Sequence, residues 1–551
     1  MQYSTRLTAA GAERLVGCGL WDRIIMPAAC DRFAAEYGTA TAVTDTERSY
    51  TWQELRSVSD GLAAALVRLG LMRGERVLVQ IPGGSMDIIL RLALKKAGML
   101  GAFAPVQWRE VELADALRRL RPAAVIMPLR FKGTEPGALL ERLQITTPAL
   151  RYRICVESTG SSGWVALPDL LAHRATLAES ATLLQRQVRF DEVSNITASS
   201  GSTGLPKLCA WPEAAQLALA RGIAERLQLI PADNVGIFCP ITGGGGLMLW
   251  VCSGLVPCKY TIADDYEPEV LLSLIERERI TVVATVPVIL ARLAQSASVG
   301  RYDLRSLRAI RVGAAAANAG LLRLAEERLG CCVVQAAGTM EIGCFAQVGL
   351  DELPSTRHGG TVGRPLLGSR VRVVDEQGAP LPPDRVGELQ VWAASAAVGY
   401  VGDGTLPIQG WDPDDLTHWF NTGDLAQQDA AGRISIVGRR KEVINRGGFK
   451  VFPLEVERVI ARHPSVEEAA VTGVPDALYG EVPWAFVLLR PGASAEAEEL
   501  EQHVRQAGLA LFKIPARFVI VDALPRLGGA KVAKQQLLTK YTSTPQASRA
   551  M

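Results

Sequence analysis

The sequence lacks several features that would each assign it to a class of proteins. It has no uninterrupted apolar run of about 18 residues, so we expect no membrane-spanning helix. Its first residues combine neither a continuous apolar core nor a small-residue cleavage site, so we expect no secretory signal. A formal net charge of +2 gives no basic excess of the kind that nucleic-acid-binding proteins use. The 48% of hydrophobic and 21% of charged residues are instead typical of a soluble globular protein.

Cysteine and histidine also lack the spacing of a metal site or a disulfide framework. The ten cysteines are scattered, with Cys331 and Cys332 adjacent, and no CxxC pair or neighbouring histidine cluster occurs. Structural zinc and a disulfide framework are therefore not expected. A reduced, cytoplasmic protein is the simplest expectation.

What the sequence does contain is an alternation of helix-like and strand-like segments. At 551 residues the chain is long enough to divide into two or more domains. Helices are predicted at 56–71 and 86–97, and buried strands at 76–81, 124–127, 280–286 and 309–312. Alternation at this pace predicts α/β layers with parallel sheets.

The pattern changes near Thr361 and again after Gly438. Short strands between Gly/Pro turns first predict an antiparallel or barrel-like segment, and a basic stretch then leads into a smaller α/β unit. The predicted elements of these parts are strands at 371–374 and 387–391 and helices at 454–463 and 497–509. Residues from about 542 are small and polar, and we expect a frayed tail. No internal repeat of fixed period is present.

A loop rich in serine and glycine follows a strand that is predicted to end near Thr197. It reads Ser199, Ser200, Gly201, Ser202, Thr203, Gly204, Leu205, Pro206, Lys207. The glycines let the backbone turn tightly and present its N–H groups, and the hydroxyls add further donors, which suits an anionic polyphosphate. The GK[ST] ending of a Walker A loop is absent. A flexible linker is the alternative, but a rigid proline followed by a cation favours phosphate binding.

This loop resembles the phosphate-binding signature of the acyl-adenylating superfamily. That superfamily includes acyl-CoA synthetases, aryl-acid AMP ligases, adenylation domains of peptide synthetases and firefly luciferase. Its other signatures follow in order over nearly the whole chain: Gly338-Thr339-Met340-Glu341, Asn421-Thr422-Gly423-Asp424, the block from Gly438 to Gly448, and Pro525 to Val532. Five separated motifs in the right order are far more specific than any one of them.

The resemblance implies a nucleotide site and a role for each of its residues. Glu341 would bind Mg²⁺, which in proteins usually takes one carboxylate plus substrate phosphates. Asp424 would contact the ribose, Arg439 would contact the ribose or a phosphate, and Lys531 would neutralise charge at the α-phosphate. The candidate catalytic residues are therefore Lys531, Glu341 and Lys207. The candidate ATP-binding residues are Ser199, Ser200, Gly201, Ser202, Thr203, Gly204, Gly313, Ala314, Ala315, Ala337, Gly338, Thr339, Asp424 and Arg439.

The resemblance also implies a domain organisation. It predicts a large N-terminal AMP-binding domain (1–438) of stacked α/β sheets with a small β-barrel-like segment. A hinge (439–441) and a mobile, smaller α+β C-terminal domain (442–541) would follow, and then a disordered tail (542–551). Lys441 falls at the hinge position, and Gly448 matches a glycine beside the thiol tunnel. Family members rotate the small domain about the hinge between two reaction steps, and we expect the same here.

Two departures from the family pattern concern the acid and the adenine. Aryl-acid AMP ligases of siderophore pathways, the closest likeness, usually carry a His-Asn pair where this chain has the run Gly243, Gly244, Gly245, Gly246. Glycines offer a phenol no side-chain hydrogen bond and leave space, and no carboxylate is present to hold an α-amino group. The candidate acid pocket is this run together with Val312, and we expect a bulkier or differently shaped acid. The alternative is that the run is only the start of a helix.

The second departure is Ala336-Ala337, where relatives place an aromatic ring against adenine. Loss of that stacking face should weaken nucleotide binding by about 1–3 kcal/mol. Adenine would then lie against the backbone of Gly313 to Ala315.

The function implied is ATP-dependent activation of a carboxylic acid to an acyl-AMP, with ATP and Mg²⁺ as cofactors. Transfer to the phosphopantetheine thiol of a carrier protein would follow, and no nucleic acid or membrane partner is expected.

Free CoA is the alternative acceptor, with Arg446 or Lys450 as cations for its 3′-phosphate. A luciferase-type oxygenase shares every motif. A non-catalytic nucleotide-binding module is an alternative of another class, although the retention of Glu341, Asp424 and Lys531 argues against it.

Overall fold

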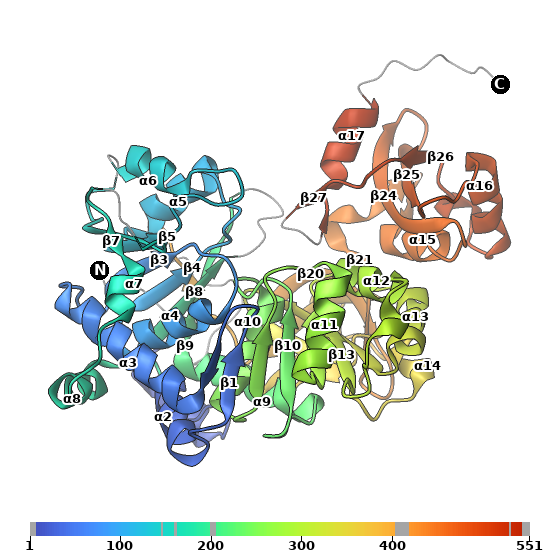
Figure 1. Cartoon of the computed structure of the whole chain (residues 1–551). Helices are drawn as coiled ribbons and strands as arrows, with labels where there is room; N and C mark the ends of the chain where they lie inside the picture. The colour runs from blue at the N-terminus through green and yellow to red at the C-terminus, as the bar shows by residue number, and fades with distance from the viewer. Residues whose placement is uncertain are drawn as a thin grey trace.

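The computed structural model describes residues 7–144, 147–158, 162–198, 205–402, 418–527 and 531–542. A large body contains the chain through β21 (Ile434–Arg439), and a smaller lobe, orange to red in Figure 1, contains the rest. The predicted α/β class is confirmed, with stacked sheets in the large body and a smaller α+β unit after it. Among the described residues, no helix is long and apolar enough to cross a membrane.

The first sheet of the large body has eight strands within the described residues, in the order β19-β9-β8-β4-β3-β5-β6-β7. Neighbours from β8 to β7 run parallel, whereas β9 and β19 are antiparallel. Its strands are β3 (Arg76–Val79), β4 (Leu100–Phe103), β5 (Ala124–Met127), β6 (Tyr152–Cys155), β7 (Val165–Ala166), β8 (Val193–Ala198), β9 (Leu208–Pro212) and β19 (Gly399–Tyr400). Strand β5 is buried along its whole length, as expected for a parallel strand that is covered on both faces.

The second sheet has nine described strands, in the order β16-β15-β14-β13-β12-β10-β11-β1-β2. Neighbours from β14 to β1 run parallel, so their carboxyl ends share one edge. The strands are β1 (Thr41–Thr44), β2 (Ser49–Thr51), β10 (Asn234–Phe238), β11 (Lys259–Ile262), β12 (Val282–Thr285), β13 (Ala309–Val312), β14 (Cys332–Thr339), β15 (Gly343–Gln347) and β16 (Arg364–Pro365). Ligands of open α/β sheets bind at that edge.

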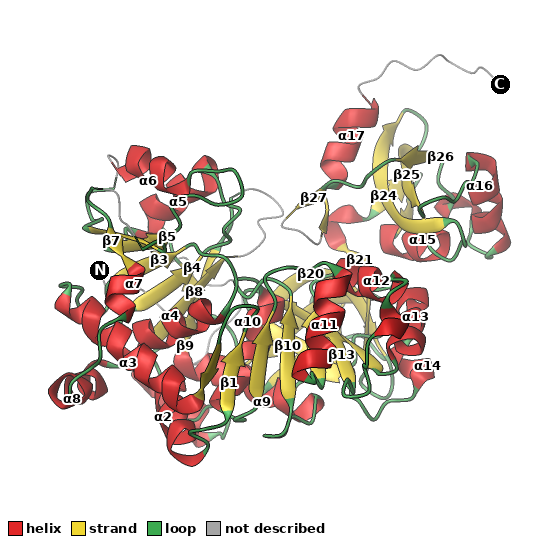
Figure 2. Cartoon of the chain, viewed as in Figure 1, coloured by secondary structure: helices red, strands yellow, loops and turns green. Residues whose placement is uncertain are grey.

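Helices cover these sheets, as the red and yellow elements of Figure 2 show. Those of the large body are α1 (Ala9–Gly17), α2 (Met26–Glu36), α3 (Trp52–Arg68), α4 (Ser85–Lys96), α5 (Glu110–Leu120), α6 (Pro136–Gln144), α7 (Leu167–Leu171), α8 (Leu177–Arg186), α9 (Glu213–Arg226), α10 (Gly244–Trp250), α11 (Pro268–Glu278), α12 (Pro287–Gln295), α13 (Ala319–Leu329) and α14 (Pro354–Arg357). Helix α3 begins earlier than the apolar period indicates because Thr51 and Glu54 form a capping box.

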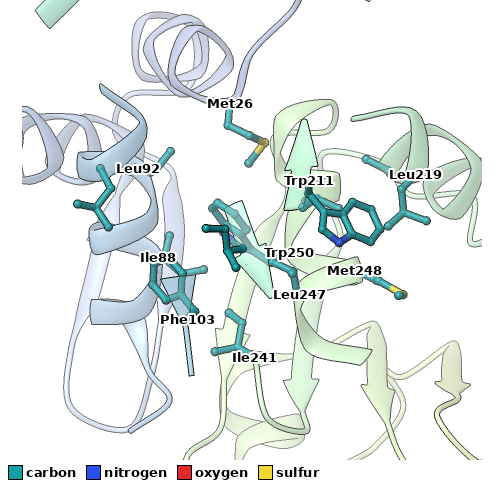
Figure 3. Packing of buried hydrophobic residues seen from close by; sticks show 14 of the residues in the cluster. Met26, Ile88, Leu92, Phe103, Trp211, Leu219, Ile241, Leu247, Met248 and Trp250 are labelled. Atoms are coloured by element: carbon teal, nitrogen blue, oxygen red, sulfur yellow. The ribbon is translucent and has the colours of Figure 1, made fainter. Parts of the chain in front are cut away.

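The core between the two sheets is filled largely by α4, α9 and α10. Figure 3 shows Trp250 and Leu247 of α10 between the helix that carries Ile88 and Leu92 and the side chain of Trp211. Helix α4 is buried almost all round, so its charged residues need partners. Lys95 Nζ lies 2.7 Å from Glu213 Oε2 of α9, and removal of either partner would leave a buried charge uncompensated.

The segment after Thr361 is a four-stranded antiparallel sheet in the order β17-β18-β20-β21, as its Gly/Pro-separated strands indicate. Its strands are β17 (Ser369–Val374), β18 (Gly387–Ala393), β20 (Phe420–Gln428) and β21. A short 3₁₀ turn, η3 (Arg440–Glu442), follows β21 directly and leads into the small lobe.

The small lobe is a sheet with helices on both faces. Its elements are β22 (Ile444–Arg446), β23 (Phe449–Val451), α15 (Pro453–Ile460), β24 (Val466–Asp476), β25 (Gly480–Leu489), α16 (Ala497–Gln506), η4 (Leu511–Lys513), β26 (Arg517–Val521), β27 (Arg526–Leu527), β28 (Lys531–Val532) and α17 (Lys534–Thr542). Alternate residues of β25 enter opposite cores, because side chains alternate across a strand. Ala485 and Val487 pack with α15 and α16, whereas Phe486 packs with α17.

Candidate functional site

The carboxyl ends of β10, β13 and β14 bring three predicted segments to one edge of the second sheet. Gly313, which directly follows β13, has its Cα next to β14: a Cβ built there would lie 3.4 Å from the carbonyl oxygen of Ala336. Ala337 is buried and pairs with Ala346 of β15. Ala314 has a φ of +68°, a left-handed conformation that an alanine adopts only under constraint from its surroundings. The backbone from Gly313 to Ala315, against which adenine is predicted to lie, is therefore a strained turn beside β14.

Glu341 lies at the centre of a three-residue cluster at the end of β14. Its backbone N–H donates to Thr339 Oγ1 (3.2 Å), which fixes the turn that presents the carboxylate. The hydroxyl of Tyr400 lies 2.9 Å from Glu341 Oε1, and Lys207 Nζ lies 3.6 Å from the same oxygen. The Glu341 side chain is only 12% exposed. Two of the predicted catalytic residues, Glu341 and Lys207, are therefore brought together.

The predicted phosphate loop from Ser199 to Gly204 lies outside the described residues, but both of its ends are described. It connects β8 to β9, which pair in antiparallel fashion with Ala198 opposite Leu208. Neighbouring strands lie about 4.8 Å apart, so the two ends of the loop are held close together. On the exit side, Arg119 Nη2 of α5 donates to the carbonyl oxygen of Pro206 (2.7 Å). The described residues on either side of the loop are thus fixed, Ala198 and Leu208 by the sheet and Pro206 by α5.

Asp424 and Arg439, the predicted ribose-binding pair, lie opposite each other on β20 and β21. Arg439 Nε is 2.6 Å from Asp424 Oδ1. Gly423 has a φ of +72°, which glycine adopts at little cost, and this turn precedes the carboxylate. The hydroxyl of Thr422 donates to the Leu389 carbonyl (2.9 Å) and accepts from the Asp424 N–H (3.1 Å). The carboxylate is therefore held both through its own backbone and by a cation.

The four glycines of the predicted acid pocket differ in their surroundings. The run caps and begins α10, so the helix-start interpretation is correct for its backbone. A Cβ on Gly244 would lie 3.1 Å from Met340 Sδ and 3.3 Å from Met248 Cε, whereas one on Gly246 would lie 2.8 Å from Ile241 Cα. Gly243 and Gly245 are partly exposed, whereas Gly246 and Val312 are buried. Gly244 is thus the glycine of the run that faces the side chain of Met340, the residue that precedes Glu341.

Two buried cysteine thiols lie next to residues of the candidate site, Cys239 near Gly245 and Cys209 near Tyr400. A Cβ on Gly245 would lie 3.2 Å from Cys239 Sγ, and burial raises the pKa of the Cys239 thiol to about 12. Cys209 is paired with Tyr400 across β9 and β19. Burial, and after it the negative charge of Glu341, raise the pKa of the Cys209 thiol as well. Both sulfurs are therefore protonated at neutral pH.

The predicted hinge and the predicted catalytic lysine lie at the start and near the end of the small lobe. Lys441 is the middle residue of η3, and Gly448 (φ +87°) lies in the turn between β22 and β23. Lys531 begins β28, paired with Leu527 of β27. The side chain of Lys531 lies outside the described part of the chain.

Comparison with known proteins identifies the family. Residues 30–401 match the family model described as AMP-binding enzyme, and residues 455–531 match the AMP-binding enzyme C-terminal domain. The chain belongs to the AMP-binding enzyme family. It is an acyl- or aryl-adenylate-forming ligase that uses ATP with Mg²⁺.

Relatives of this AMP-binding enzyme include proteins named as a synthase, as an AMP ligase and as a CoA ligase. Pyochelin synthase PchD of Pseudomonas aeruginosa is 30% identical over 540 residues, covering 96% of this chain and 94% of the relative. The 2,3-dihydroxybenzoate-AMP ligase of Bacillus subtilis is 30% identical, covering 92% and 91%. The 2-hydroxy-7-methoxy-5-methyl-1-naphthoate–CoA ligase of Streptomyces carzinostaticus is 29% identical, covering 96% and 95%. ATP-bound MatB of Rhodopseudomonas palustris shares the fold, with a TM-score of 0.82 at 24% identity and coverage of 95% and 99%.

The oxygen ligands that this AMP-binding enzyme offers fit a magnesium ion that takes most of its ligands from the nucleotide substrate. Among the described residues, no group of three or more His, Cys, Asp or Glu side chains is gathered that could hold a metal ion. Mg²⁺ commonly takes one or two protein carboxylates and completes its shell with phosphate oxygens and water. Glu341, a single carboxylate on a turn at the edge of the sheet, is the residue that would hold it.

Sequence reasoning missed three residues of the site of this AMP-binding enzyme. Tyr400 contacts Glu341, from which it is separated by 59 positions in the sequence. Arg119 contacts Pro206, from which it is separated by 87 positions. The sequence gives Met340 only as part of a motif, yet its side chain faces Gly244, and its carbonyl accepts from Trp211 Nε1 (3.2 Å). The only local sequence signal for Tyr400 is the dipeptide Gly399-Tyr400, which forms the short strand β19 in the structure.

Proposed function

We propose that the enzyme activates an aryl or heteroaryl acid, and not an α-amino acid, and passes it to the phosphopantetheine thiol of a carrier protein in secondary-metabolite biosynthesis. The observation that carries this proposal is the surroundings of Gly244. The groups that face it are the thioether of Met340 and the methyl of Met248, which are soft and apolar and suit a flat ring. Neither offers a carboxylate to an ammonium group or a donor to a phenol.

In the first step a carboxylate oxygen of the acid attacks the α-phosphorus of ATP. A C–O–P linkage forms, the bond between the α-phosphorus and its bridging oxygen breaks, and pyrophosphate leaves with the electron pair. Both reactants are anions, so catalysis consists of positioning and charge neutralisation, and no general base is needed. Bound Mg²⁺ would supply part of the positive charge. Glu341 would hold it, Asp424 and Arg439 would fix the ribose, and Lys207 and Lys531 would face the phosphates.

In the second step the acceptor thiol attacks the acyl carbonyl. The carbon–sulfur bond forms, AMP leaves, and the thiol proton passes to solvent. Two ion pairs support a rotation centred on Lys441 between the steps. Arg440 pairs with Glu388 of the large body, and Glu442 Oε2 lies 2.8 Å from Lys534 Nζ of the small lobe. Lys441 stands between these anchored residues and makes no ion pair with the described residues. We propose a large domain at 1–438, a hinge at 439–441 and a small domain at 442–541.

The surroundings of Gly448 support a carrier protein over free CoA as acceptor. Both cations considered for the CoA 3′-phosphate already have partners: Arg446 Nη1 donates to the carbonyls of Phe512 and Ile514, and Lys450 Nζ lies 3.2 Å from Glu376. An exposed apolar surface lies beside them. It consists of Phe449, Leu478, Tyr479 and Leu511, which we call the β23 patch. Exposed apolar patches of this kind mark protein–protein contact sites.

The activation half is tested by acid-dependent ATP–pyrophosphate exchange over a panel of aryl, heteroaryl, aliphatic and α-amino acids. We expect exchange with one or more ring acids and none with α-amino acids. Exchange confined to α-amino or aliphatic acids would contradict the proposed acid class. Silence over a broad panel would argue for the non-catalytic module.

The acceptor is tested by thioester formation with that acid, using either free CoA or a phosphopantetheinylated aryl carrier protein. We expect faster transfer to the carrier. Phe449→Glu should slow transfer to the carrier at least about tenfold, because it places a charge in the β23 patch, and should leave pyrophosphate exchange unchanged. Faster transfer to CoA, or an equal effect of Phe449→Glu on both acceptors, would favour the CoA ligase alternative.

Asp424→Asn is expected to raise the KM for ATP about 10–100-fold. Loss of a hydrogen bond from a charged group costs about 1.5–3 kcal/mol, and Arg439 would lose its counter-charge in the same change. The matched control is Asp429→Asn in the same hairpin, where Asp429 Oδ2 lies 2.7 Å from Arg433 Nε. That exchange should leave the KM for ATP unaltered. Similar KM values for the two variants would remove Asp424 from the site.

Gly244→Ala and Gly246→Ala are expected to act differently. At Gly244 the new methyl group meets the flexible ends of two methionines, so the free energy of unfolding should change by less than about 1 kcal/mol while the KM for the acid rises. At Gly246 it meets backbone atoms of Ile241 and Pro240, which should cost about 1–3 kcal/mol of stability. Denaturant unfolding and acid titrations measure both. An unchanged acid preference in Gly244→Ala would place the pocket elsewhere.

A further inference from the structure

Tyr400 belongs to a short segment that joins Glu341 to the strand after the phosphate loop. Within that segment, the N–H of Ala397 donates to the backbone carbonyl of Glu341 (2.8 Å), and the N–H of Val401 donates to the carbonyl of Leu208 (2.8 Å). Tyr400 itself pairs with Cys209 of β9. The segment thus ties the turn that carries Glu341 to the strand that begins directly after Lys207.

The side chain of Tyr400 connects the two functional groups as well. Its hydroxyl lies 2.9 Å from Glu341 Oε1 and 3.4 Å from Lys207 Nζ, and the ammonium lies 4.9 Å from the centre of the ring. An ammonium can only donate and a carboxylate can only accept. The hydroxyl must therefore accept from Lys207 and donate to Glu341, and the direction of both hydrogen bonds is fixed.

We propose that Tyr400 is a positioning residue that holds one oxygen of Glu341 and thereby orients the other for the metal ion of the nucleotide. The inference rests on the proposed role of Glu341 as metal ligand. Without the hydroxyl, Lys207 would be left as the neighbour of Glu341 Oε1, and the ammonium would compete with the cation for the carboxylate and be kept from the phosphates. Removal of a group that orients a metal ligand typically weakens metal affinity about 10–100-fold.

The test is Tyr400→Phe, with Tyr260→Phe as matched control. Tyr260 is buried in β11, and its hydroxyl accepts from Cys258 Sγ (3.4 Å) away from the site. Binding of Mn²⁺ in the presence of α,β-methylene-ATP, followed by electron paramagnetic resonance, reports the metal site without turnover. We expect the Mn²⁺ dissociation constant and the Mg²⁺ concentration for half-maximal pyrophosphate exchange to rise about tenfold in Tyr400→Phe. Exchange at saturating Mg²⁺ should return to within a few-fold of the wild type.

A double-mutant cycle separates the possible outcomes. In a Glu341→Ala background Tyr400→Phe should have no further effect on Mn²⁺ affinity, because Tyr400 acts through Glu341. An unchanged Mn²⁺ affinity in Tyr400→Phe, or equal losses in both backgrounds, would overturn this inference alone. If Glu341→Ala itself leaves Mn²⁺ affinity unchanged, the proposed metal-binding role of Glu341 fails instead. A lower melting temperature with unaltered Mn²⁺ affinity would show that Tyr400 is only structural.

Discussion

Lys531→Ala should slow acyl-adenylate formation about 100–1,000-fold, the usual cost of removing one preorganised charge-stabilising group from a transition state. The reaction joins a carboxylate to a nucleotide phosphate, and both are anionic. A cation at the point of attack therefore stabilises the transition state more than it stabilises the separate reactants. Thioester formation from preformed acyl-AMP should proceed at close to the wild-type rate, because pyrophosphate has already left and no second anion attacks.

Three measurements make the Lys531 prediction specific. Pyrophosphate exchange reports the first step, and thiol acylation from synthetic acyl-AMP reports the second. Lys531→Arg, which keeps the charge, should recover part of the exchange rate. Lys540→Ala, an exposed lysine of α17 in the same lobe, should leave both steps unchanged. Equal losses of both steps in Lys531→Ala would mean that the substitution damages the lobe and would contradict a role confined to adenylation.

Lys441→Pro should leave adenylation within a few-fold of the wild type and lower thioester formation at least about tenfold. Proline fixes φ near −65° and restricts the residue before it, so it removes backbone freedom at one position. Here the ion pair of Arg440 with Glu388 and that of Glu442 with Lys534 hold the flanking residues to opposite parts of the molecule. If the two parts rotate as we propose, we expect the rotation to be absorbed at Lys441, where the proline acts.

The matched control for this variant is Lys441→Ala, which removes the same side chain and keeps the backbone free. It should retain both half-reactions, measured as pyrophosphate exchange and as acylation of the acceptor thiol. If Lys441→Pro slows both steps equally, or if Lys441→Ala reproduces its effect, rotation about this residue is not required for thiol transfer.

The sequence predicted those parts of the fold that depend on local periodicity. The strands at 124–127 and 309–312 occur with the predicted bounds, and the helix expected at 497–509 is α16, three residues shorter at its end. Helix α3 begins four residues before its predicted start, because a capping box and not an apolar residue determines where it begins. Periodicity thus identifies an element well and its first turn poorly.

The candidate site was predictable where one motif carries both a residue and its geometry, as with Asp424 in its glycine turn. Tyr400 and Arg119 could not be found in the same way, since their contacts depend on which strands pair and which helix lies over the loop. The left-handed backbone of Ala314 is likewise invisible in the sequence, because an alanine gives no local reason for a positive φ. These features are products of tertiary packing, which overrides local preference at sites of this kind.

An enzyme that manufactures an activated acyl group must also avoid acylating itself. Cys239, whose sulfur lies beside the position of Gly245, is the nearest described thiol to the candidate acid pocket. Burial raises the pKa of this thiol, so at neutral pH it is protonated, and the thiolate is the form that acts as a nucleophile. Burial thus makes this cysteine a small apolar wall residue that can coexist with a mixed anhydride. A variant of Gly243 to Gly246 that admits water to Cys239 is therefore expected to make this thiol more reactive toward the acyl-AMP.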